Sequence, residues 1–378
     1  MSPKTESVAS AGSERIACPP QADELELSLF GSGCGECAVV HLGANEWMVV
    51  DSCLDEHDSP VSLAYLKKLG IDAAKQVLIV VASHWHDDHV HGLSAVFEEC
   101  KKAKVVFASA LTTIEFQTVM EAYGDDRMLP GSSGVQEMKG VIKCLESRST
   151  ASPSPHELSC ANKRIHLRGS IGECSPIEVW TLSPSDSAAL LAIRHIAAWS
   201  NRSKKPKRRV ESQSPNHLAT VLWVDMGGRR MLLGADLEES NRPDLGWQAI
   251  LCSKSRPSGK AEVFKVPHHG SCNAHSPGVW QGMLDNPVSA LTPFTRSSLP
   301  RPSQIELIAS LSREAYLAAP PRPATVWSPP DPAVAKTLRE SNIAVRNTVC
   351  GLGHIRVRWL SGTPPVTEVF GLAHRLGS

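Results

Sequence analysis

The stretch VVASHWHDDHVHGL, residues 80–93, places four histidines and two aspartates at the end of an apolar run. That run, KQVLIVVAS, has the composition of a buried strand. A strand that ends in a turn rich in imidazole and carboxylate groups indicates a metal site at one end of a sheet. The alternative is an exposed loop that carries histidines, with Asp-Asp beginning a helix. Further ligands elsewhere in the chain would favour the metal site.

Composition limits the class of protein. The 378 residues suffice for a large two-layer α/β unit with insertions. Lys+Arg and Asp+Glu number 39 each, so net charge gives no general argument for nucleic acid or an anionic membrane. No stretch approaches the ~20 apolar residues of a membrane span, and the N-terminal stretch MSPKTESVASAGSERIACPPQ lacks the apolar region of a signal peptide. We therefore expect a cytoplasmic protein without a membrane segment, whose eleven cysteines form no disulfides.

The apolar pattern predicts an α/β chain. Three short runs, ELELSLF, CAVVHLG and EWMVVDSC, indicate an antiparallel meander over 24–53. Helical spacing in PVSLAYLKKLG, GLSAVFEECKKA, SDSAALLAIRHIAAW and PSQIELIASL alternates with further strands, among them KVVFAS, IEVWTLSP, AEVFKV, VSALTPF and GHIRVRWL. HLATVLWVDMGGRRMLLGAD predicts a hairpin that turns at Gly227-Gly228.

These elements predict one domain over 24–360 between a disordered N-terminal tail, 1–23, and a C-terminal tail, 361–378. Loop insertions are expected at 145–175, where SRSTASPSPHE is low in complexity, and at 200–215, which is polar and basic.

The spacing H-W-H-D-D-H can serve two metal ions. A turn that leaves the end of a buried strand can aim His84 and His86 at one point, and Asp88 and His89 at a second point nearby. Two ions ~3.5–4 Å apart with such ligands form a two-metal hydrolytic site. Imidazole together with carboxylate favours zinc, with manganese or iron as alternatives.

SHWHDDHVHG contains the H-x-H-x-D-H signature, so the chain resembles the metallo-β-lactamase superfamily of hydrolases. The resemblance implies an αββα sandwich with two metals at one edge. It also implies that Asp51, after WMVV, orients the histidine loop, and that Asp236, in MLLGAD, bridges both metals. The alternative for Asp236 is a helix N-cap before LEES.

The last metal ligand is expected in VFKVPHHGS. We choose His268, the residue that leaves the strand. We expect His269 either to support the metal ligands or to contact the substrate, and to act with Asp88 in catalysis, where Asp88 can also carry a proton. For a third ligand to the first metal, SPNHLATVLWV offers His217, with Asn216 as the alternative. The sequence KVPHHGS, together with the stretch around Asn216, is most similar to the hydrolase domain of the competence protein ComEC and its soluble relatives. Those domains often carry asparagine at the position of the third ligand.

The resemblance implies hydrolysis by metal-activated water but does not define the substrate. The similarity to ComEC-type domains favours a phosphodiesterase or nuclease that acts on nucleic acid or nucleotides. Ser271 and Asn273 offer donors beside the site. A basic run before His217 can hold phosphates or can be a solvated loop; its members are Lys204, Lys205, Lys207, Arg208 and Arg209.

Two other functions remain open at this point. A hydrolase of lactones, thioesters or β-lactams would use an apolar pocket, to which Trp85 could contribute. A catalytically degenerate scaffold would use the fold only to bind a partner.

Overall fold

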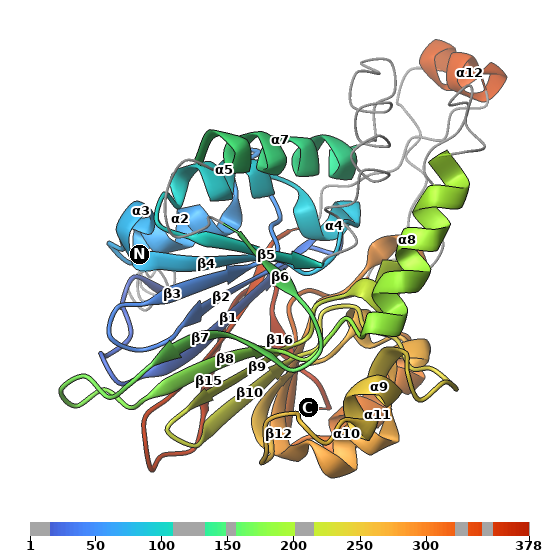
Figure 1. Ribbon diagram of the computed structural model, residues 1–378. Helices are drawn as coiled ribbons and strands as arrows, with labels where there is room; N and C mark the ends of the chain where they lie inside the picture. The colour runs from blue at the N-terminus through green and yellow to red at the C-terminus, as the bar shows by residue number, and fades with distance from the viewer. Residues whose placement is uncertain are drawn as a thin grey trace, which may run out of the picture.

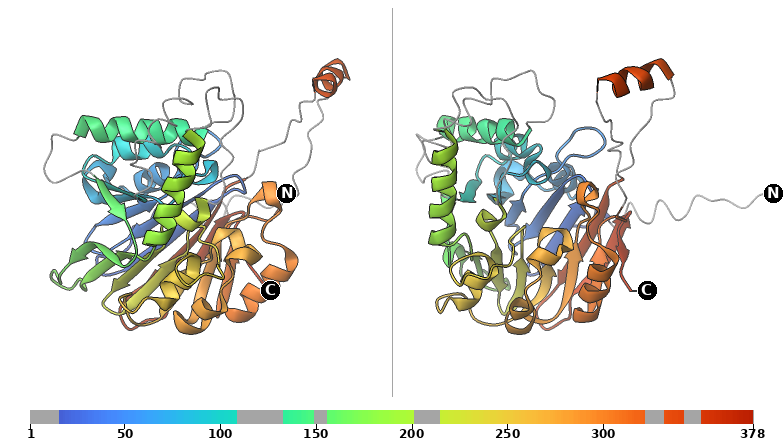
Figure 2. Two further views of the ribbon diagram at one scale, coloured as in Figure 1. Left: turned by 45° about the vertical axis from the view of Figure 1, so that its right-hand side comes forward. Right: turned by 90° about the vertical axis from the view of Figure 1, so that its right-hand side faces the viewer.

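The computed structural model describes residues 16–108, 133–148, 156–200, 215–321, 332–341 and 351–377. Two sheets pack face to face, and helices cover the outer face of each (Figures 1 and 2). The predicted αββα sandwich is therefore confirmed. No helix in the described part of the chain is both long enough and apolar enough to cross a membrane.

The first sheet has the strand order β15-β14-β1-β2-β3-β4-β5-β6. Strands β1 to β3 form the predicted antiparallel meander, whereas β3 to β6 run parallel to one another. The carboxyl ends of β3 and β4 consequently lie at the same edge. The bounds are β1 (Leu25–Gly31), β2 (Glu36–His41), β3 (Trp47–Val50), β4 (Val77–Ala82), β5 (Lys104–Ala108), β6 (His156–Ser159), β14 (Gly353–Trp359) and β15 (Val366–Gly371).

The second sheet has the order β16-β13-β12-β11-β10-β9-β8-β7. The predicted hairpin joins β9 to β10, and Gly227 and Gly228 both have positive φ, at 59° and 93°, as a tight turn of this kind requires. Strands β10 to β13 are parallel, so their carboxyl ends meet at one edge. The bounds are β7 (Lys163–Arg168), β8 (Ile177–Thr181), β9 (Leu222–Met226), β10 (Arg229–Leu233), β11 (Ala261–Lys265), β12 (Leu284–Leu291), β13 (Glu314–Leu317) and β16 (His374–Arg375).

Helices complete the layers. Those over the first sheet are α2 (Val61–Lys68), α3 (Ala73–Gln76), α4 (Asp87–Val90), α5 (Leu93–Glu99) and α7 (Ser133–Arg148). Beside the second sheet lie α8 (Asp186–Ser200), α9 (Gly246–Cys252), α10 (Pro277–Gly282) and α11 (Pro302–Leu311), and α12 spans Pro332–Glu340. Short 3-10 turns are η2 (Pro215–Leu218), η3 (His268–Gly270), η4 (Cys272–Ala274) and η5 (Thr295–Ser297).

Burial on both faces explains the continuous apolar run of β4. Ile79 and Val81 pack between the two sheets, whereas Val80 and Ala82 pack against the helices over the first sheet. A strand covered on both sides has no solvent face, so its sequence does not alternate. This packing also fixes the point at which the histidine loop leaves the sheet.

The boundaries differ from the predictions in three places. The segment 361–378 is not a tail, because β15 and β16 within it extend the two sheets. The expected insertion 145–175 contains β6 and β7. These are short or outer strands, partly exposed, and their polar residues conceal them in the sequence. Within 1–23, residues 16–23 are described and Asp23 pairs with Arg229 at 3.0 Å. Residues 1–15 and almost all of 200–215 lie outside the described residues.

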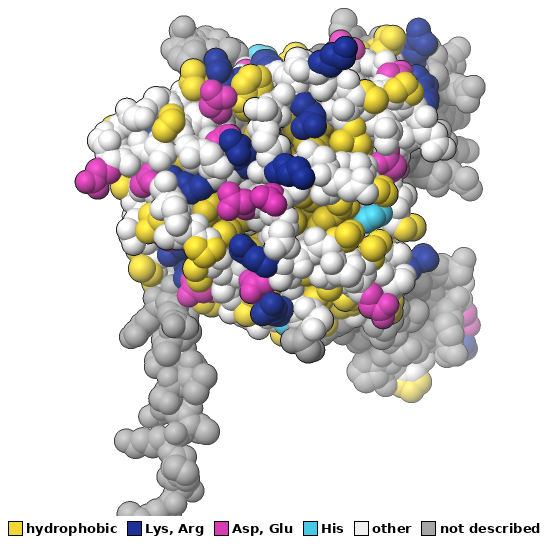
Figure 3. Space-filling view, turned by 90° about the horizontal axis from the view of Figure 1, so that it is seen from below, with side chains coloured by type: hydrophobic (Ala, Val, Ile, Leu, Met, Phe, Trp, Pro, Cys, Tyr) yellow, Lys and Arg dark blue, Asp and Glu magenta, His cyan; other side chains and the backbone are white. Residues whose placement is uncertain are grey.

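The underside of the molecule carries side chains of mixed character. Seen from below, Lys and Arg are interspersed with Asp, Glu and apolar side chains (Figure 3). This face therefore presents no large region of one charge.

Candidate metal centre

The predicted histidine and aspartate residues follow the carboxyl ends of parallel strands in both sheets. Asp51 comes directly after β3, and its backbone N–H donates to the Val81 carbonyl at 2.8 Å. The loop after β4 carries His84 and His86 and leads into α4. Asp236 follows β10 and the histidine pair follows β11. Facing sheets thus bring residues far apart in the sequence to one edge of the sandwich.

His84, His86 and Asp236 form the first donor group, in which one ligand atom of each lies within 4.8 Å of the others. His84 Nε2 lies 3.0 Å from His86 Nδ1 and 3.9 Å from Asp236 Oδ2. His84 and Asp236 are almost fully buried.

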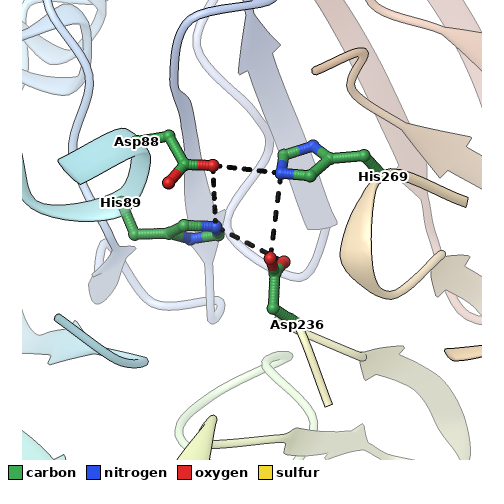
Figure 4. A group of neighbouring side chains, drawn as sticks. All are labelled: Asp88, His89, Asp236 and His269. Carbon is green, nitrogen blue, oxygen red and sulfur yellow. Dashed lines mark hydrogen bonds and ion pairs between the residues drawn. The ribbon is translucent and has the colours of Figure 1, made fainter. Parts of the chain in front are cut away.

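Asp88, His89, Asp236 and His269 form the second donor group (Figure 4). His269 Nε2 lies 3.2 Å from Asp88 Oδ2 and 3.8 Å from Asp236 Oδ2. His89 Nε2 lies 3.4 Å from Asp236 Oδ1 and 3.7 Å from Asp88 Oδ2. Because Asp236 belongs to both groups, its carboxylate lies where a ligand shared by two ions has to lie.

The donor atoms fit a binuclear metal site. His89 Nε2 and Asp236 Oδ1, 3.4 Å apart, are among the buried side-chain atoms of the described residues that make no hydrogen bond. Buried polar atoms almost always have a hydrogen-bond partner, so two neighbouring buried atoms without one indicate a place for a bound group. Imidazole nitrogens and carboxylate oxygens are the ligands of zinc, manganese and iron.

The electrostatics of the cluster also favour cations. Burial alone lowers the pKa of His89, but the carboxylates of Asp236 and Asp88 outweigh it and raise that pKa well above its usual value. For Asp236 burial raises the pKa, but His89 and His269 hold it well below the usual range. The cluster therefore keeps its carboxylates ionised and stabilises positive charge between them.

Asp51 lies outside both groups and acts on their histidines. Its Oδ1 accepts from the Ser83 backbone N–H at 2.7 Å, and its Oδ2 lies 2.6 Å from Ser83 Oγ and 2.7 Å from His89 Nδ1. Burial raises the pKa of Asp51, and the contacts with His89 and Ser83 oppose that rise. A proton held on Nδ1 of His89 leaves Nε2 directed at the second group.

The choice between His268 and His269 is reversed by the geometry. His269, not the sequence-based choice His268, lies in the second donor group. Both residues have positive φ, at 47° and 52°, and this left-handed turn points the second histidine inward. His268 lies on the rim, with Nε2 4.0 Å from Asp236 Oδ2 and Nδ1 3.5 Å from Glu238 Oε1.

Of the two candidates for a third ligand to the first metal, Asn216 lies beside Glu238 and His268. Asn216 Nδ2 donates to Glu238 Oε1 at 2.8 Å and lies 3.4 Å from His268 Nε2. His217 belongs to neither donor group found among the described residues. The choice between His217 and Asn216 as the third ligand therefore stays a prediction.

The expected substrate-contacting residues are placed differently from one another. Asn273 Nδ2 donates to Glu238 Oε1 at 2.9 Å, on the rim beside His268. Ser271 instead lines an apolar cavity behind the loop. Trp85 is partly buried and packs against the core under α5. The five basic residues from Lys204 to Arg209 lie outside the described residues.

Sequence reasoning missed several residues at the centre. Phe294 stacks on His269 with ring centroids 5.1 Å apart. Glu36, Lys265 and Thr292 lie buried beneath the second donor group. Of these, only the lysine inside the apolar strand AEVFK gave a signal, because lysine is almost never buried without a partner.

Comparison with known proteins agrees with this geometry. Residues 35–132 match the family model described as metallo-beta-lactamase superfamily, and this range contains Asp51 and the whole histidine loop. No curated protein matches the sequence.

Solved structures are similar only at a low level. The metallo-beta-lactamase fold protein YhfI from Bacillus subtilis is 11% identical over 71% of this chain and 85% of its own, with a TM-score of 0.31. Zn²⁺-bound PqqB from Methylobacterium extorquens is 9% identical over 60% of this chain and 55% of its own, with a TM-score of 0.29. The dizinc quorum-quenching lactonase AidC is 11% identical over 53% of this chain and 55% of its own, also with a TM-score of 0.29.

These scores carry no argument about function, and the chain spans little more than half of PqqB and AidC. The assignment depends on the family match, the two layered sheets and the donor groups at their edge. The chain therefore has an αββα sandwich consistent with the metallo-beta-lactamase fold, and residues 35–132 are similar to the metallo-beta-lactamase superfamily.

Proposed function

We propose that the protein is a metal-dependent hydrolase that uses two divalent ions to cleave phosphodiester bonds in nucleic acid or nucleotides. The observation that carries the hydrolase proposal is the sharing of Asp236 by two donor groups at one edge of the sandwich. A shared carboxylate holds two ions close enough to act on one reacting group.

His84, His86 and Asp236 would hold one ion, with Asn216 beside them, and Asp88, His89, Asp236 and His269 would hold the other. Zinc is the expected metal, with manganese or iron as alternatives. When bound, two such ions supply a nucleophile from water at neutral pH and offset the negative charge that develops on a phosphate.

The chain's own residues position the reactants and move a proton. The pKa of Asp88 is lowered, because His89 and His269 together outweigh its burial, so the carboxylate is ionised. In this proposal Asp88 also carries a proton during turnover. His268 and Asn273 lie on the rim, where both can donate to a phosphate oxygen. Phe294 covers one face of the His269 ring.

The phosphodiester substrate is supported by the sequence. KVPHHGS resembles ComEC-type hydrolase domains, and the basic run at 204–209 lies a few residues before Asn216 and His217 in the sequence. The basic run is therefore the part of this proposal that most needs a test.

A second candidate is the hydrolysis of a small acyl ester such as a lactone or thioester. Directly after the histidine pair, Gly270 and Ser271 line a cavity of about 210 Å³, whose walls include Trp247, Phe264 and Trp280. An apolar cavity of this kind can hold an acyl chain.

A substrate panel separates the two candidates. The purified protein, supplied with zinc or manganese, is assayed on single-stranded DNA, double-stranded DNA, RNA, cyclic dinucleotides and a bis-aryl phosphate. A lactone, a thioester and a cephalosporin complete the panel. Cleavage of the phosphodiesters, abolished by Asp236→Asn, supports the proposal. Turnover of the lactone or thioester alone refutes the phosphodiesterase assignment.

A further inference from the structure

Three buried polar residues beneath the second donor group have no part in the function described so far. Glu36 begins β2, Lys265 ends β11 and Thr292 follows β12. Their exposed fractions are 3%, 3% and 0%. Removing charged groups from water is costly unless they are paired and hydrogen-bonded, so this arrangement requires a compensating contact or role.

Lys265 and Glu36 form an ion pair at the junction of the two sheets. Lys265 Nζ contacts Glu36 Oε1 and also donates to the Ala235 carbonyl at 2.8 Å, next to Asp236. The contact joins an ammonium to a carboxylate, so each group supplies the charge that offsets the burial of the other.

Thr292 connects Glu36 to His269. Its hydroxyl donates to Glu36 Oε2 at 2.5 Å, because a carboxylate can only accept. With its proton used in this way, Thr292 Oγ1 can only accept from His269 Nδ1, 3.0 Å away, and the Thr292 carbonyl, at 3.3 Å, is a second acceptor for the same atom. Nδ1 of His269 thus carries a proton, and Nε2 faces Asp88 and Asp236.

The same arrangement occurs at the first donor group. The hydroxyl of Ser83 donates to Asp51 Oδ2 at 2.6 Å, and Ser83 Oγ lies 3.0 Å from His84 Nδ1. A carboxylate, a hydroxyl and an imidazole therefore follow one another in both places. In one, Asp51 acts through Ser83 on His84, and in the other, Glu36 acts through Thr292 on His269.

We propose that Glu36, held by Lys265, is a positioning residue that acts through the Thr292 hydroxyl to fix the tautomer and orientation of His269 for the second metal ion. This inference rests on the proposed metal site. Partners of this kind around metal-binding histidines typically change metal affinity about 10- to 100-fold when they are removed.

Glu36 itself is not a metal ligand in this arrangement. Glu36, Asp51 and His89 lie close enough together to suggest a third ion. The ammonium group of Lys265, however, already supplies the positive charge that Glu36 needs. Nδ1 of His89 likewise faces Asp51 at 2.7 Å. Glu36 and Asp51 therefore position the neighbouring histidines rather than bind a third ion.

Gly31 keeps Thr292 in place. A Cβ atom at Gly31 would lie 2.5 Å from Thr292 Cγ2 and 2.8 Å from its Cβ, which is too close for any real contact. Gly31→Ala would therefore displace Thr292 without removing a polar group. This substitution tests the position of the hydroxyl independently of its chemistry.

The test is metal affinity in buffered zinc, measured for both ions on the full chain. Thr292→Val keeps the shape and removes the hydroxyl, and Thr292→Ser keeps the hydroxyl. We expect Thr292→Val to weaken the second ion about 10- to 100-fold and to leave the first ion within about threefold. Thr292→Ser should restore near wild-type affinity, and Gly31→Ala should weaken the second ion as Thr292→Val does.

Three results would overturn the inference. The first is wild-type affinity for the second ion in Thr292→Val. The second is a Thr292→Ser variant as weak as Thr292→Val, which would mean that the residue only fills space. The third is a wild-type protein that binds no second ion, which would overturn the proposed function as well. If Thr292→Val does not fold, Gly31→Ala and Thr292→Ser decide between the outcomes. A protein that binds two ions without cleaving any phosphodiester refutes the proposed substrate alone.

Discussion

Substituting Asp51 by asparagine tests how the fold prepares its histidines for metal. The wild-type carboxylate accepts hydrogen bonds from the Ser83 backbone N–H, the Ser83 hydroxyl and His89 Nδ1. In Asp51→Asn the amide oxygen has to face the backbone N–H, because that donor cannot reverse its role. The amide NH₂ then faces the hydroxyl and the imidazole, both of which can become acceptors.

For His89 this reversal moves the proton from Nδ1 to Nε2. Nε2 is the atom that faces Asp236 Oδ1 at 3.4 Å and Asp88 Oδ2 at 3.7 Å, and a protonated nitrogen cannot bind metal. To bind, His89 has to return its proton to Nδ1, against the amide NH₂, and leave a buried donor unsatisfied. That costs about 1–3 kcal/mol, which corresponds to a Kd for the second ion roughly 5- to 150-fold weaker.

The first ion should be weakened less. Asp51 reaches His84 only through the Ser83 hydroxyl, whose oxygen can accept from both the new amide and His84 Nδ1. Asp51→Asn therefore weakens both ions, whereas Thr292→Val weakens only the second.

Bound zinc per chain is measured after equilibrium dialysis against chelator-buffered metal. Asp285→Asn is the matched control, because Asp285 is exposed on β12. An Asp51→Asn protein with wild-type affinity for the second ion would refute the tautomer reasoning.

Three further predictions concern the first donor group, the basic run and acid stability. His84→Ala combined with His86→Ala should remove one of the two bound ions, measured as metal content, because the first group loses both imidazoles; unchanged stoichiometry would contradict the grouping. Replacing the five basic residues of 204–209 by Gln should raise KM for a long nucleic acid and flatten the salt dependence of binding by about 0.9 per lost phosphate contact, while turnover of a bis-aryl phosphate stays the same; equal losses on both substrates would indicate a structural role. Burial lowers the pKa of His41 to about 4, whereas an unfolded histidine titrates near 6.5. Its contribution to stability, roughly 3 kcal/mol, is complete above pH ~6.5 and is lost as the pH falls toward ~4, so the advantage of the metal-free wild type over His41→Gln in urea unfolding should shrink over that range. A constant difference would show that His41 titrates normally in the fold.

The sequence was sufficient to predict a strand that is buried on both faces and a turn that requires glycine. The run KQVLIVVAS predicted β4 because both faces of that strand are covered, and Gly227-Gly228 predicted the β9–β10 turn because both residues need positive φ. The strands β7 and β15 were missed for the opposite reason. Their residues are partly exposed and polar, so nothing in their pattern distinguishes them from loops.

The sequence also predicted that the site residues lie together at one edge of the sandwich, but it did not predict which histidine of the pair points inward. His84, Asp88, Asp236 and the histidine pair all follow strand ends, and parallel strands bring such positions to one edge. Which histidine of the pair points inward depends on two consecutive left-handed backbone conformations. Histidine does not indicate a left-handed backbone conformation, so the choice of His268 could not have been corrected from the sequence.

The supports of the two donor groups were beyond sequence reasoning for a different physical reason. Asp51 follows β3, and Ser83 and His84 follow β4, so the hydrogen bonds from Asp51 through Ser83 to His84 depend on the pairing of these two strands of the first sheet. Glu36 lies in the first sheet, whereas Lys265, Thr292 and His269 lie in or beside the second. The hydrogen bonds from Glu36 through Thr292 to His269 therefore form only when the two sheets are packed in register. It follows that a change that shifts one sheet against the other disturbs both ions through Asp236, but disturbs the hydrogen bonds that support the histidines only at the second ion.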